Sequence, residues 1–159
     1  MKKLLSEFLK DSKRSDRELS KILRTSQPTV SRMRQALVNE GLIKEFTVVP
    51  DFKELGFQIM AISTFRTQES KAIAEKAVEW TMAKPNVVFA ARTEGMGKNR
   101  VMISLHKDYG DYVRFIREVK GEGEGIIRDH DSLLISLEGL IIKPFSLRYL
   151  AELIEASEE

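Results

Sequence analysis

The sequence predicts an α+β protein in two parts, on three observations. Up to residue 43 the apolar residues recur at helical spacing, which indicates a group of helices. After residue 57, short apolar and β-branched runs alternate with two helix-like segments, which indicates a sheet with helices. The charge changes near the same place: residues 1–50 hold eleven Lys or Arg against six Asp or Glu, and residues 51–159 hold fifteen against eighteen.

Three helices, starting near Leu4, Ser15 and Ser26, are expected in the first part. The second helix begins with a capping box, because Ser15 and Glu18 are spaced so that each side chain can bond the other's backbone amide. Ser26 is a good N-cap for the third helix, and Gly41 suits the left-handed position just past its end. The second and third helices are therefore joined by a tight turn.

The third helix carries a polar face opposite its buried stripe. Val30, Met33 and Leu37 recur at i, i+3 and i+7, so they define the stripe. The opposite face carries Arg and Gln, which can form paired hydrogen bonds with guanine and adenine edges. Two helices arranged in this way can place the second one in the DNA major groove. The residues expected to contact DNA are Ser26, Gln27, Thr29, Ser31, Arg32, Arg34, Gln35 and Lys44, of which Arg34 and Lys44 are better placed for the phosphate backbone.

A polar helix face that is merely solvated is the simpler explanation of the same pattern. The pattern alone therefore does not decide between DNA binding and a solvated face. The charge partition favours DNA. Residues 1–50 carry a net charge of +5, against −3 for the remainder, and a basic domain attracts phosphates.

The residues after the third helix suggest a wing and a linker. Ile43 to Val49 is rich in β-branched residues and ends at Pro50, so a strand is expected there. We therefore expect a winged helix-turn-helix domain over residues 1–50, a linker over residues 51–57 and a second domain over residues 58–159.

The second domain is expected to follow the order β-α-β-β-α-β, which is the ferredoxin-like arrangement. Ser70 and Asp108 are suited to cap its two helices, and residues 94–99 form the turn between the second and third strands. Apolar residues at helical spacing after Ser146 predict an added C-terminal helix. The expected strands cover residues 58–66, 87–93 and 100–107, and residues 132–142 are expected to supply a last strand or two. The expected helices cover residues 70–84, 108–120 and 146–156.

Two helices can cover only one face of such a sheet. Met60, Ile62 and Val101 would lie on the other face, with nothing from the same chain to cover them. An uncovered apolar face implies a partner, so we expect a homodimer. A symmetric dimer would present its two DNA-binding helices to half-sites about 34 Å apart, or a multiple of that spacing.

Short motifs in the first domain match a known family. They are Asp16-Arg17-Glu18-Leu19-Ser20, Ser26-x-x-Thr29-Val30-x-Arg32, Leu37, Gly41-Leu42-Ile43-Lys44, Phe46-Thr47-Val48-Val49-Pro50-Asp51 and Leu55-Gly56. Through them, the stretch from about Leu4 to Phe57 resembles the winged helix-turn-helix of the Lrp/AsnC (leucine-responsive/asparagine-synthesis) transcription regulators. The element order of the second domain is also similar to that family, whose RAM-type domain packs sheet to sheet across a two-fold axis. The resemblance implies a regulator that binds double-stranded DNA as a homodimer, tetramer or octamer, in the cytoplasm and on the nucleoid.

The turn between the second and third strands departs from the family. Members that sense amino acids usually carry a Gly-Asp-containing turn there, whereas residues 93–100 of this chain contain no Asp. The corresponding effector positions are Glu94, Gly95, Met96 and Gly97. The missing Asp argues against an amino-acid effector and leaves open whether there is a small-molecule effector.

Several kinds of chemistry are not supported. The chain has no cysteine, so neither disulfides nor thiolate metal sites can form. Gly95-x-Gly97-Lys98 lacks the first Gly of a phosphate loop, and Asn99 stands where Ser or Thr should follow the Lys. His106 at a strand end and His130 in a polar loop are isolated, so structural or solvated roles are expected for both. We therefore expect no catalytic residue, no metal, no cofactor and no enzyme activity.

Two other classes remain open. Some haem-pathway decarboxylases are similar to this family and keep a vestigial helix-turn-helix, but they need basic and histidine residues around a tetrapyrrole. This chain has two His, and its third helix keeps a basic face, which argue against that class. The other alternative is an effector-sensing or adaptor module whose helices contact only proteins. No apolar run of about 18 residues occurs, so no membrane partner is expected.

Overall fold

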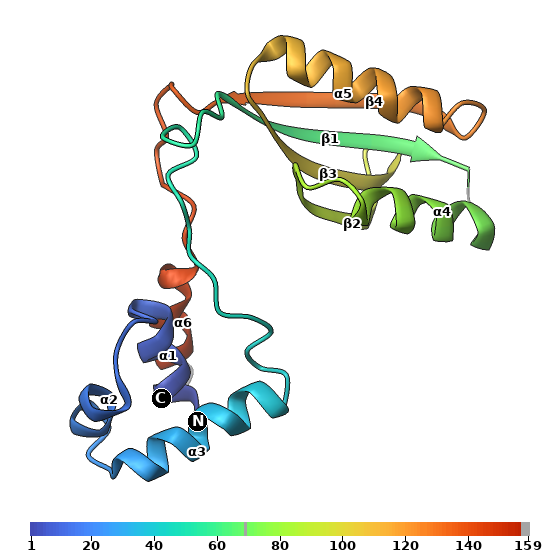
Figure 1. Ribbon diagram of the computed structural model, residues 1–159. Coiled ribbons are helices and arrows are strands. Elements are labelled where there is room, and N and C mark those ends of the chain that lie inside the picture. The colour runs from blue at the N-terminus through green and yellow to red at the C-terminus, as the bar shows by residue number, and fades with distance from the viewer. Residues whose placement is uncertain (69, 157–159) are drawn as a thin grey trace. The chain divides into compact units, whose positions relative to one another are not determined.

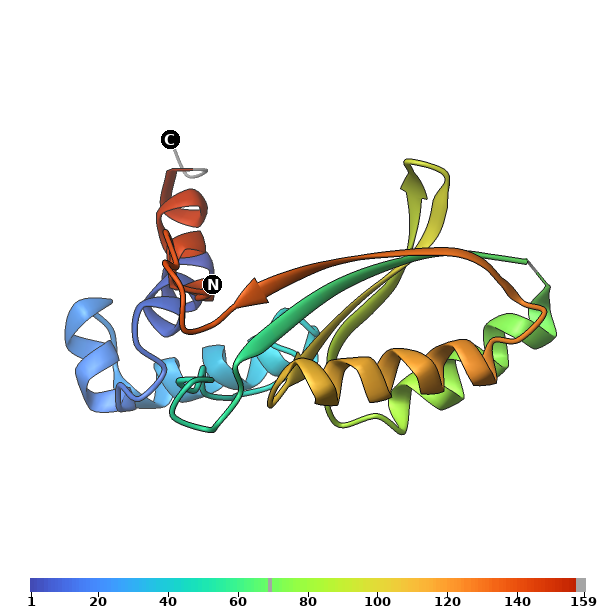
Figure 2. The same cartoon turned by 90° about the horizontal axis from the view of Figure 1, so that it is seen from above.

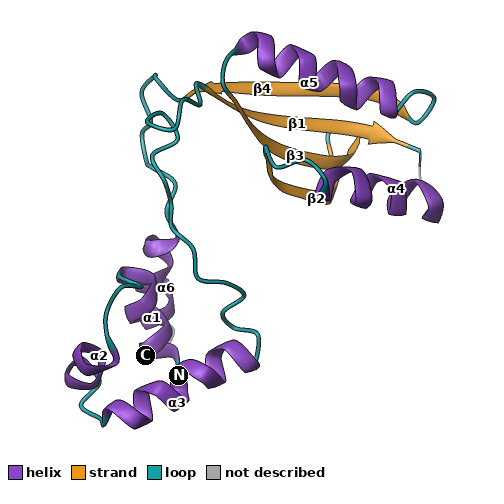
Figure 3. Ribbon diagram, in the orientation of Figure 1, coloured by secondary structure: helices purple, strands orange, loops and turns teal. Residues whose placement is uncertain are grey.

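The computed structural model describes residues 1–68 and 70–156 and divides into two compact units. Residues 1–49, with the described residues from 143 onward, form the first unit, and residues 50–142 form the second (Figure 1). The first unit is helical, and the second contains the four strands (Figure 3). The expected α+β class is confirmed. None of the described helices has the length and the apolar stretch needed to cross a lipid bilayer.

Three helices open the first unit: α1 (Lys2–Lys10), α2 (Asp16–Ile22) and α3 (Gln27–Asn39). The expected capping box is present, since the Ser15 amide donates to Glu18 Oε2 at 2.8 Å and the Glu18 amide donates to Ser15 Oγ at 3.3 Å. Ser26 caps α3 in the same way. The three helices share a core of Leu4, Phe8, Leu19, Val30 and Leu37.

The C-terminal helix also belongs to this unit. A short 3₁₀ turn, η1 (Leu147–Tyr149), leads into α6 (Leu150–Ala156), which lies beside α1 (Figure 1). Ala151 is only 1% exposed, and Ser6 Oγ donates to Glu155 Oε1 at 2.7 Å. We had placed residues 143–159 with the second domain, and those that the structure describes group with the first unit instead. The reason is a contact between segments far apart in sequence, which periodicity does not reveal.

The prediction of a strand from Ile43 to Val49 is wrong, because residues 43–50 form no strand in the structure. A strand needs a neighbour that accepts and donates its backbone hydrogen bonds. Among the described residues no second segment pairs with this one, although its β-branched residues favour an extended backbone. Phe46 instead packs edge-on against Phe8, with ring centroids 5.9 Å apart.

The second unit contains one antiparallel sheet in the order β2-β3-β1-β4. Both of its helices lie on the same side of that sheet (Figure 2). This is the predicted ferredoxin-like arrangement. The elements are β1 (Ile59–Thr67), α4 (Lys71–Met82), β2 (Val87–Gly95), β3 (Lys98–His106), α5 (Tyr109–Glu122) and β4 (Ile127–Ser136).

The fourth strand lies earlier in the chain than expected. We predicted residues 132–142, whereas β4 covers Ile127–Ser136 and includes His130, which we had placed in a loop. Residues 128–131 are polar, yet they pair with the end of β1, with Arg66 opposite Asp129. Because β4 is at the edge of the sheet, charged side chains are tolerated there and guard against pairing with other chains.

Residues on one face of the sheet form the core with the helices. Ala61, Phe65 and Met102 are buried against side chains of α5, and Trp80 of α4 packs against the same cluster. The members contributed by α5 are Tyr112, Phe115, Ile116 and Val119.

The opposite face is apolar, as expected from Met60, Ile62 and Val101. One row crosses all four strands: Phe89 pairs with Ile103, Ile103 with Ile62, and Ile62 with Leu133. Leu133 remains 70% exposed and Phe89 53% exposed. We call the set Met60, Ile62, Phe89, Val101, Ile103, Leu133 and Ile135 the open face.

His106 is a buried titratable group at the end of β3. Its ring is fully buried, shares a hydrogen bond of 2.8 Å with Ser104 Oγ, and lies against Tyr112 and Phe115. Its Nδ1 is 3.7 Å from Asp111 Oδ2. Burial lowers the pKa of His106 below 6.5, and the nearby Asp111 carboxylate opposes that shift. The ring is therefore neutral in the folded protein at neutral pH.

We predict that the free energy of unfolding decreases below about pH 6.5, the unperturbed value for histidine. The unfolded chain binds the His106 proton before the folded chain does. Stability is therefore complete above that pH and is lost as the pH falls toward the folded-state pKa, by up to about 1.4 kcal/mol per pH unit. Urea denaturation from about pH 7.5 to about pH 5.5 measures the slope, and His106→Gln should make it shallower.

His130 provides the matched comparison, because burial lowers its pKa as well. His130→Gln should also reduce the slope. The variant with both substitutions should lose most of the pH dependence of the free energy of unfolding that the two histidines together produce. The same slope in wild type and His106→Gln would show that the buried ring takes up its proton in the folded protein.

Candidate functional site

The polar face of α3 points away from the core of the first unit. Val30 and Leu37 are fully buried, which fixes the rotation of the helix about its axis. Arg32 and Gln35, on the opposite side, are exposed. The structure thus brings the expected contact residues onto one accessible face. Ser26, Gln27, Ser31 and Lys44 are likewise exposed, and Thr29 is half-buried.

Short-range hydrogen bonds orient the polar side chains of α3. The hydroxyls of Ser26 and Thr29 share a hydrogen bond of 2.8 Å, and Arg32 Nη2 reaches Thr29 Oγ1 at 3.5 Å. Gln35 Nε2 donates to Asn39 Oδ1 at 2.8 Å. These bonds join exposed groups within one helix, so they can be exchanged for bonds to base edges with little loss.

Arg34 lies differently from the position we expected for a phosphate contact. Its Nη2 donates to Asp16 Oδ1 of α2, and its guanidinium carbon lies 4.6 Å from the ring centroid of Phe8 in α1. The Arg34 side chain is 31% exposed, and its Nε is buried without a hydrogen-bond partner. Its positive charge therefore joins the three helices together.

Three further exposed cations of the first unit were not singled out from the sequence. Arg17 and Lys21 of α2 and Arg24 of the following turn are all exposed. Arg24 has φ of +52°, an uncommon conformation for a residue with a side chain. The excess of basic residues in the first fifty positions was the signal that could have identified them.

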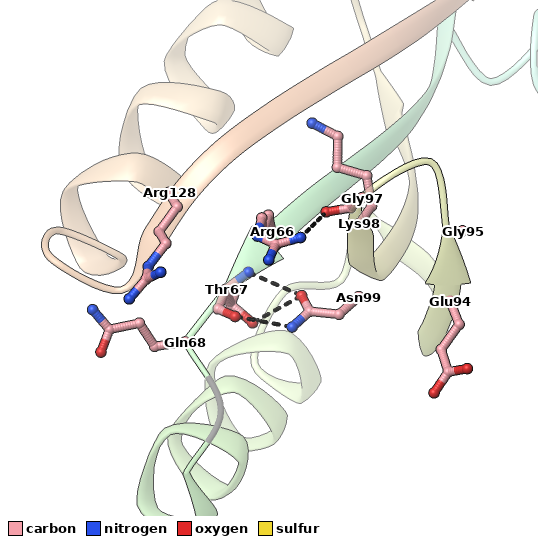
Figure 4. Close-up of a pocket in the computed structure, with 9 residues that line it drawn as sticks. All are labelled: Arg66, Thr67, Gln68, Glu94, Gly95, Gly97, Lys98, Asn99 and Arg128. Carbon is pink, nitrogen blue, oxygen red and sulfur yellow. Dashed lines mark hydrogen bonds between the residues drawn. The ribbon is translucent and has the colours of Figure 1, made fainter.

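A hollow of about 540 Å³ lies beside the β2–β3 hairpin (Figure 4). Three of the four predicted effector positions line it: Glu94, Gly95 and Gly97. The fourth, Met96, is 99% exposed at the tip of the turn, with φ of +51°. The hollow is also lined by Arg66, Thr67, Gln68, Lys98, Asn99 and Arg128.

Asn99 and Arg66 hold the hairpin against the end of β1 (Figure 4). The Thr67 amide donates to Asn99 Oδ1, and Asn99 Nδ2 donates to the Thr67 carbonyl, both at 2.9 Å. Arg66 Nη1 donates to the Gly97 carbonyl at 3.0 Å. The walls of the hollow are therefore fixed by direct hydrogen bonds.

Lys98 is neutralised by two carboxylates of β4. Its ammonium group pairs with Asp129 and, at 2.7 Å, with Asp131, while its side chain is 6% exposed. The hydrogen bonds that Lys98 donates to Asp129 and Asp131 raise the pKa of Lys98, and the one accepted by Asp129 lowers the pKa of that carboxyl group. Lys98 and Asp129 therefore stay ionised, and the charge of Lys98 is already balanced. Within residues 1–68 and 70–156, no group of three or more His, Asp or Glu side chains is arranged to hold a metal ion.

Comparisons with known proteins point to one kind of protein. A family model described as winged helix-turn-helix DNA-binding matches residues 1–44. The chain is 30% identical over 126 residues to the uncharacterised HTH-type transcriptional regulator PH0061 of Pyrococcus horikoshii, covering 73% of this chain and 75% of that protein. It is 30% identical over 92 residues to the HTH-type transcriptional regulator LrpC of Bacillus subtilis, covering 58% of this chain and 62% of LrpC.

Solved structures share the fold. The crystal structure of PH0061 matches with a TM-score of 0.75 at 24% identity, over 90% of this chain and 92% of that one. The structure of AsnC from E. coli matches with a TM-score of 0.72 at 15% identity, over 91% and 94% of the two chains.

We predict that Arg34→Gln lowers the free energy of unfolding by about 1–2 kcal/mol, because it removes a partly exposed ion pair and a contact with an aromatic ring. Arg32→Gln removes the same charge from the same helix and serves as the matched control. Its expected effect is within about 0.5 kcal/mol, since Arg32 is exposed. Thermal or urea denaturation of both variants measures the difference, and equal stabilities would contradict the structural role of Arg34.

Proposed function

Since the chain belongs to the Lrp/AsnC family of transcription regulators, we propose that it binds specific DNA sites as a symmetric homodimer, or as an assembly of such dimers. We infer from the family resemblance that it acts in the cytoplasm, on the nucleoid. The relatives named above are regulators and not enzymes, which argues against the decarboxylase alternative.

The orientation of α3 is the observation that supports DNA binding most directly. Its apolar stripe is buried in the helical core, so Arg32 and Gln35 are available to base edges. Lys44 and the neighbouring exposed cations would contact phosphates, which supplies affinity without sequence preference. The proposed contact set is the predicted one with Arg34 removed, because its charge is already paired with Asp16.

The open face supports the homodimer. An apolar row crosses all four strands on the side opposite the helices, and its end members Phe89 and Leu133 are more than half exposed. Packing the same face of a second copy against it would bury both rows at once. Such a dimer carries two copies of α3, as a palindromic site requires.

A small molecule bound at the hollow beside the β2–β3 hairpin would modulate this regulator. Glu94, Gly95, Met96 and Gly97 are the proposed effector positions. The support is that three of them line a hollow whose volume suits a small ligand.

We predict that Arg32→Ala weakens binding to the preferred site by about 1–3 kcal/mol and relaxes the base preference at one position of each half-site. Lys44→Ala is the contrasting variant and should weaken binding to all sequences about equally. Selecting bound fragments from random DNA with wild type and both variants gives the base preferences, and titration at several salt concentrations gives the affinities. Equal weakening of all sequences by Arg32→Ala would reduce Arg32 to a phosphate contact.

We predict that wild type sediments as a dimer, and that Leu133→Asp shifts it toward the monomer. A carboxylate buried in a packed apolar interface is costly, whereas Leu133 is 70% exposed within one chain, so folding should be preserved. Val78→Asp, on the outer side of α4 and 63% exposed, is the matched control. Analytical ultracentrifugation measures the oligomer, and circular dichroism verifies the fold. A monomeric wild type that still selects palindromic sites would overturn the proposed dimer.

A further inference from the structure

We propose that the hollow beside the β2–β3 hairpin binds a small anion that carries carboxylate or phosphate groups and no ammonium group, held by Arg66 and Arg128. This inference rests on the proposed function, because it names the chemical class of the effector.

Two guanidinium groups at the hollow, those of Arg66 and Arg128, form no ion pair with a described carboxylate. Arg66 and Arg128 both line the hollow and are both exposed. Among the described residues neither forms an ion pair, and Arg66 uses one of its five N–H donors in its hydrogen bond to the Gly97 carbonyl. Planar guanidinium groups are suited to grip carboxylate and phosphate oxygens with paired hydrogen bonds.

The fold supplies these two arginines from adjacent strands. Arg66 is near the end of β1, and Arg128 is near the start of β4, where the register places Arg66 opposite Asp129. In Figure 4 the Arg128 guanidinium points toward Gln68, on the same side of the hollow as Thr67. An anion in the hollow would therefore meet donors from both strands.

An ammonium group would find one carboxylate, that of Glu94, among the described residues that line the hollow. The Glu94 carboxylate points away from Arg66 and Arg128 (Figure 4). Asp129 and Asp131, which are not part of that lining, pair with Lys98. A zwitterionic amino acid would thus have its carboxylate satisfied and its ammonium group unpaired, at a cost in affinity.

The volume, lining and hydrogen-bonded walls of the hollow also suit a small anion. Its volume of about 540 Å³ lies within the range of small-molecule sites, and seven of the nine described residues that line it are polar or charged, which favours a charged ligand over an apolar one. Gly95 and Gly97, with φ of +143° and +72°, leave that side of the rim without side chains. The Thr67–Asn99 hydrogen bonds fix the walls before binding, so little ordering is needed.

Isothermal titration of the full chain with succinate, inorganic phosphate and leucine tests the proposal. We expect succinate or phosphate to bind at millimolar concentration or below, more tightly than leucine, and the stronger of the two identifies the anionic group. Arg66→Gln combined with Arg128→Gln should weaken that binding by about tenfold or more, because two charge-assisted contacts are lost. Arg117→Gln, which removes an exposed charge from α5 outside the hollow, is the matched control and should bind as wild type does.

Arg128→Gln alone guards against misfolding of the double variant, since Arg128 has no hydrogen bond to lose among the described residues. It should weaken anion binding while the melting temperature stays unchanged. Failure of both anions to bind, tighter binding of leucine, or equal binding by Arg117→Gln and the double variant would each overturn the proposal. DNA binding is measured in parallel: DNA binding without anion binding refutes only the ligand class, whereas anion binding without DNA binding refutes the regulator.

Discussion

The alternation of side chains along β1 is the constraint on which the second unit depends. β1 is paired on both edges, by β3 and β4, so its side chains can point only up or down from the sheet. Ala61 and Phe65 therefore enter the core beneath the helices, and Met60 and Ile62 must face the other way. A shift of one residue in register would exchange these sets and expose the core. The same alternation produces both a stable unit and an apolar surface suited to a second copy.

In the first unit, position around the axis of α3 likewise decides which side chains are exposed. Arg32 and Arg34 are two residues apart, which places them about 200° apart around α3. Arg32 therefore reaches the exposed side, and Arg34 turns back toward Asp16 and Phe8. Two residues of identical charge therefore have different roles: Arg32 is available to an anionic partner, and Arg34 joins neighbouring helices. Composition alone counts both as basic, and only the position around the helix separates them.

Local signals in the sequence predicted most of the fold. The Ser15–Glu18 capping box, the Ser26 cap and the hairpin at Gly95–Lys98 depend on residues close together in the chain, and the structure confirms them. Features that depend on distant partners were missed. The segment from Ile43 has strand-like residues but no paired neighbour, and residues 128–131 look like a loop until β1 pairs with them. The hollow is a similar case, because Arg66 and Arg128 are brought together by strand pairing, not by a motif.

The contact between α1 and α6 has a consequence for how the polypeptide is made. Residues 50–142 are inserted, in sequence, between two portions of a single compact body. During translation α1 emerges first, yet Ser6 and Lys10 meet Glu155 only after the ribosome has produced the entire intervening sheet. A nascent fragment ending soon after α3 would leave the α6-facing side of α1 uncovered. The contact between α1 and α6 can therefore form only after the insert has been synthesised.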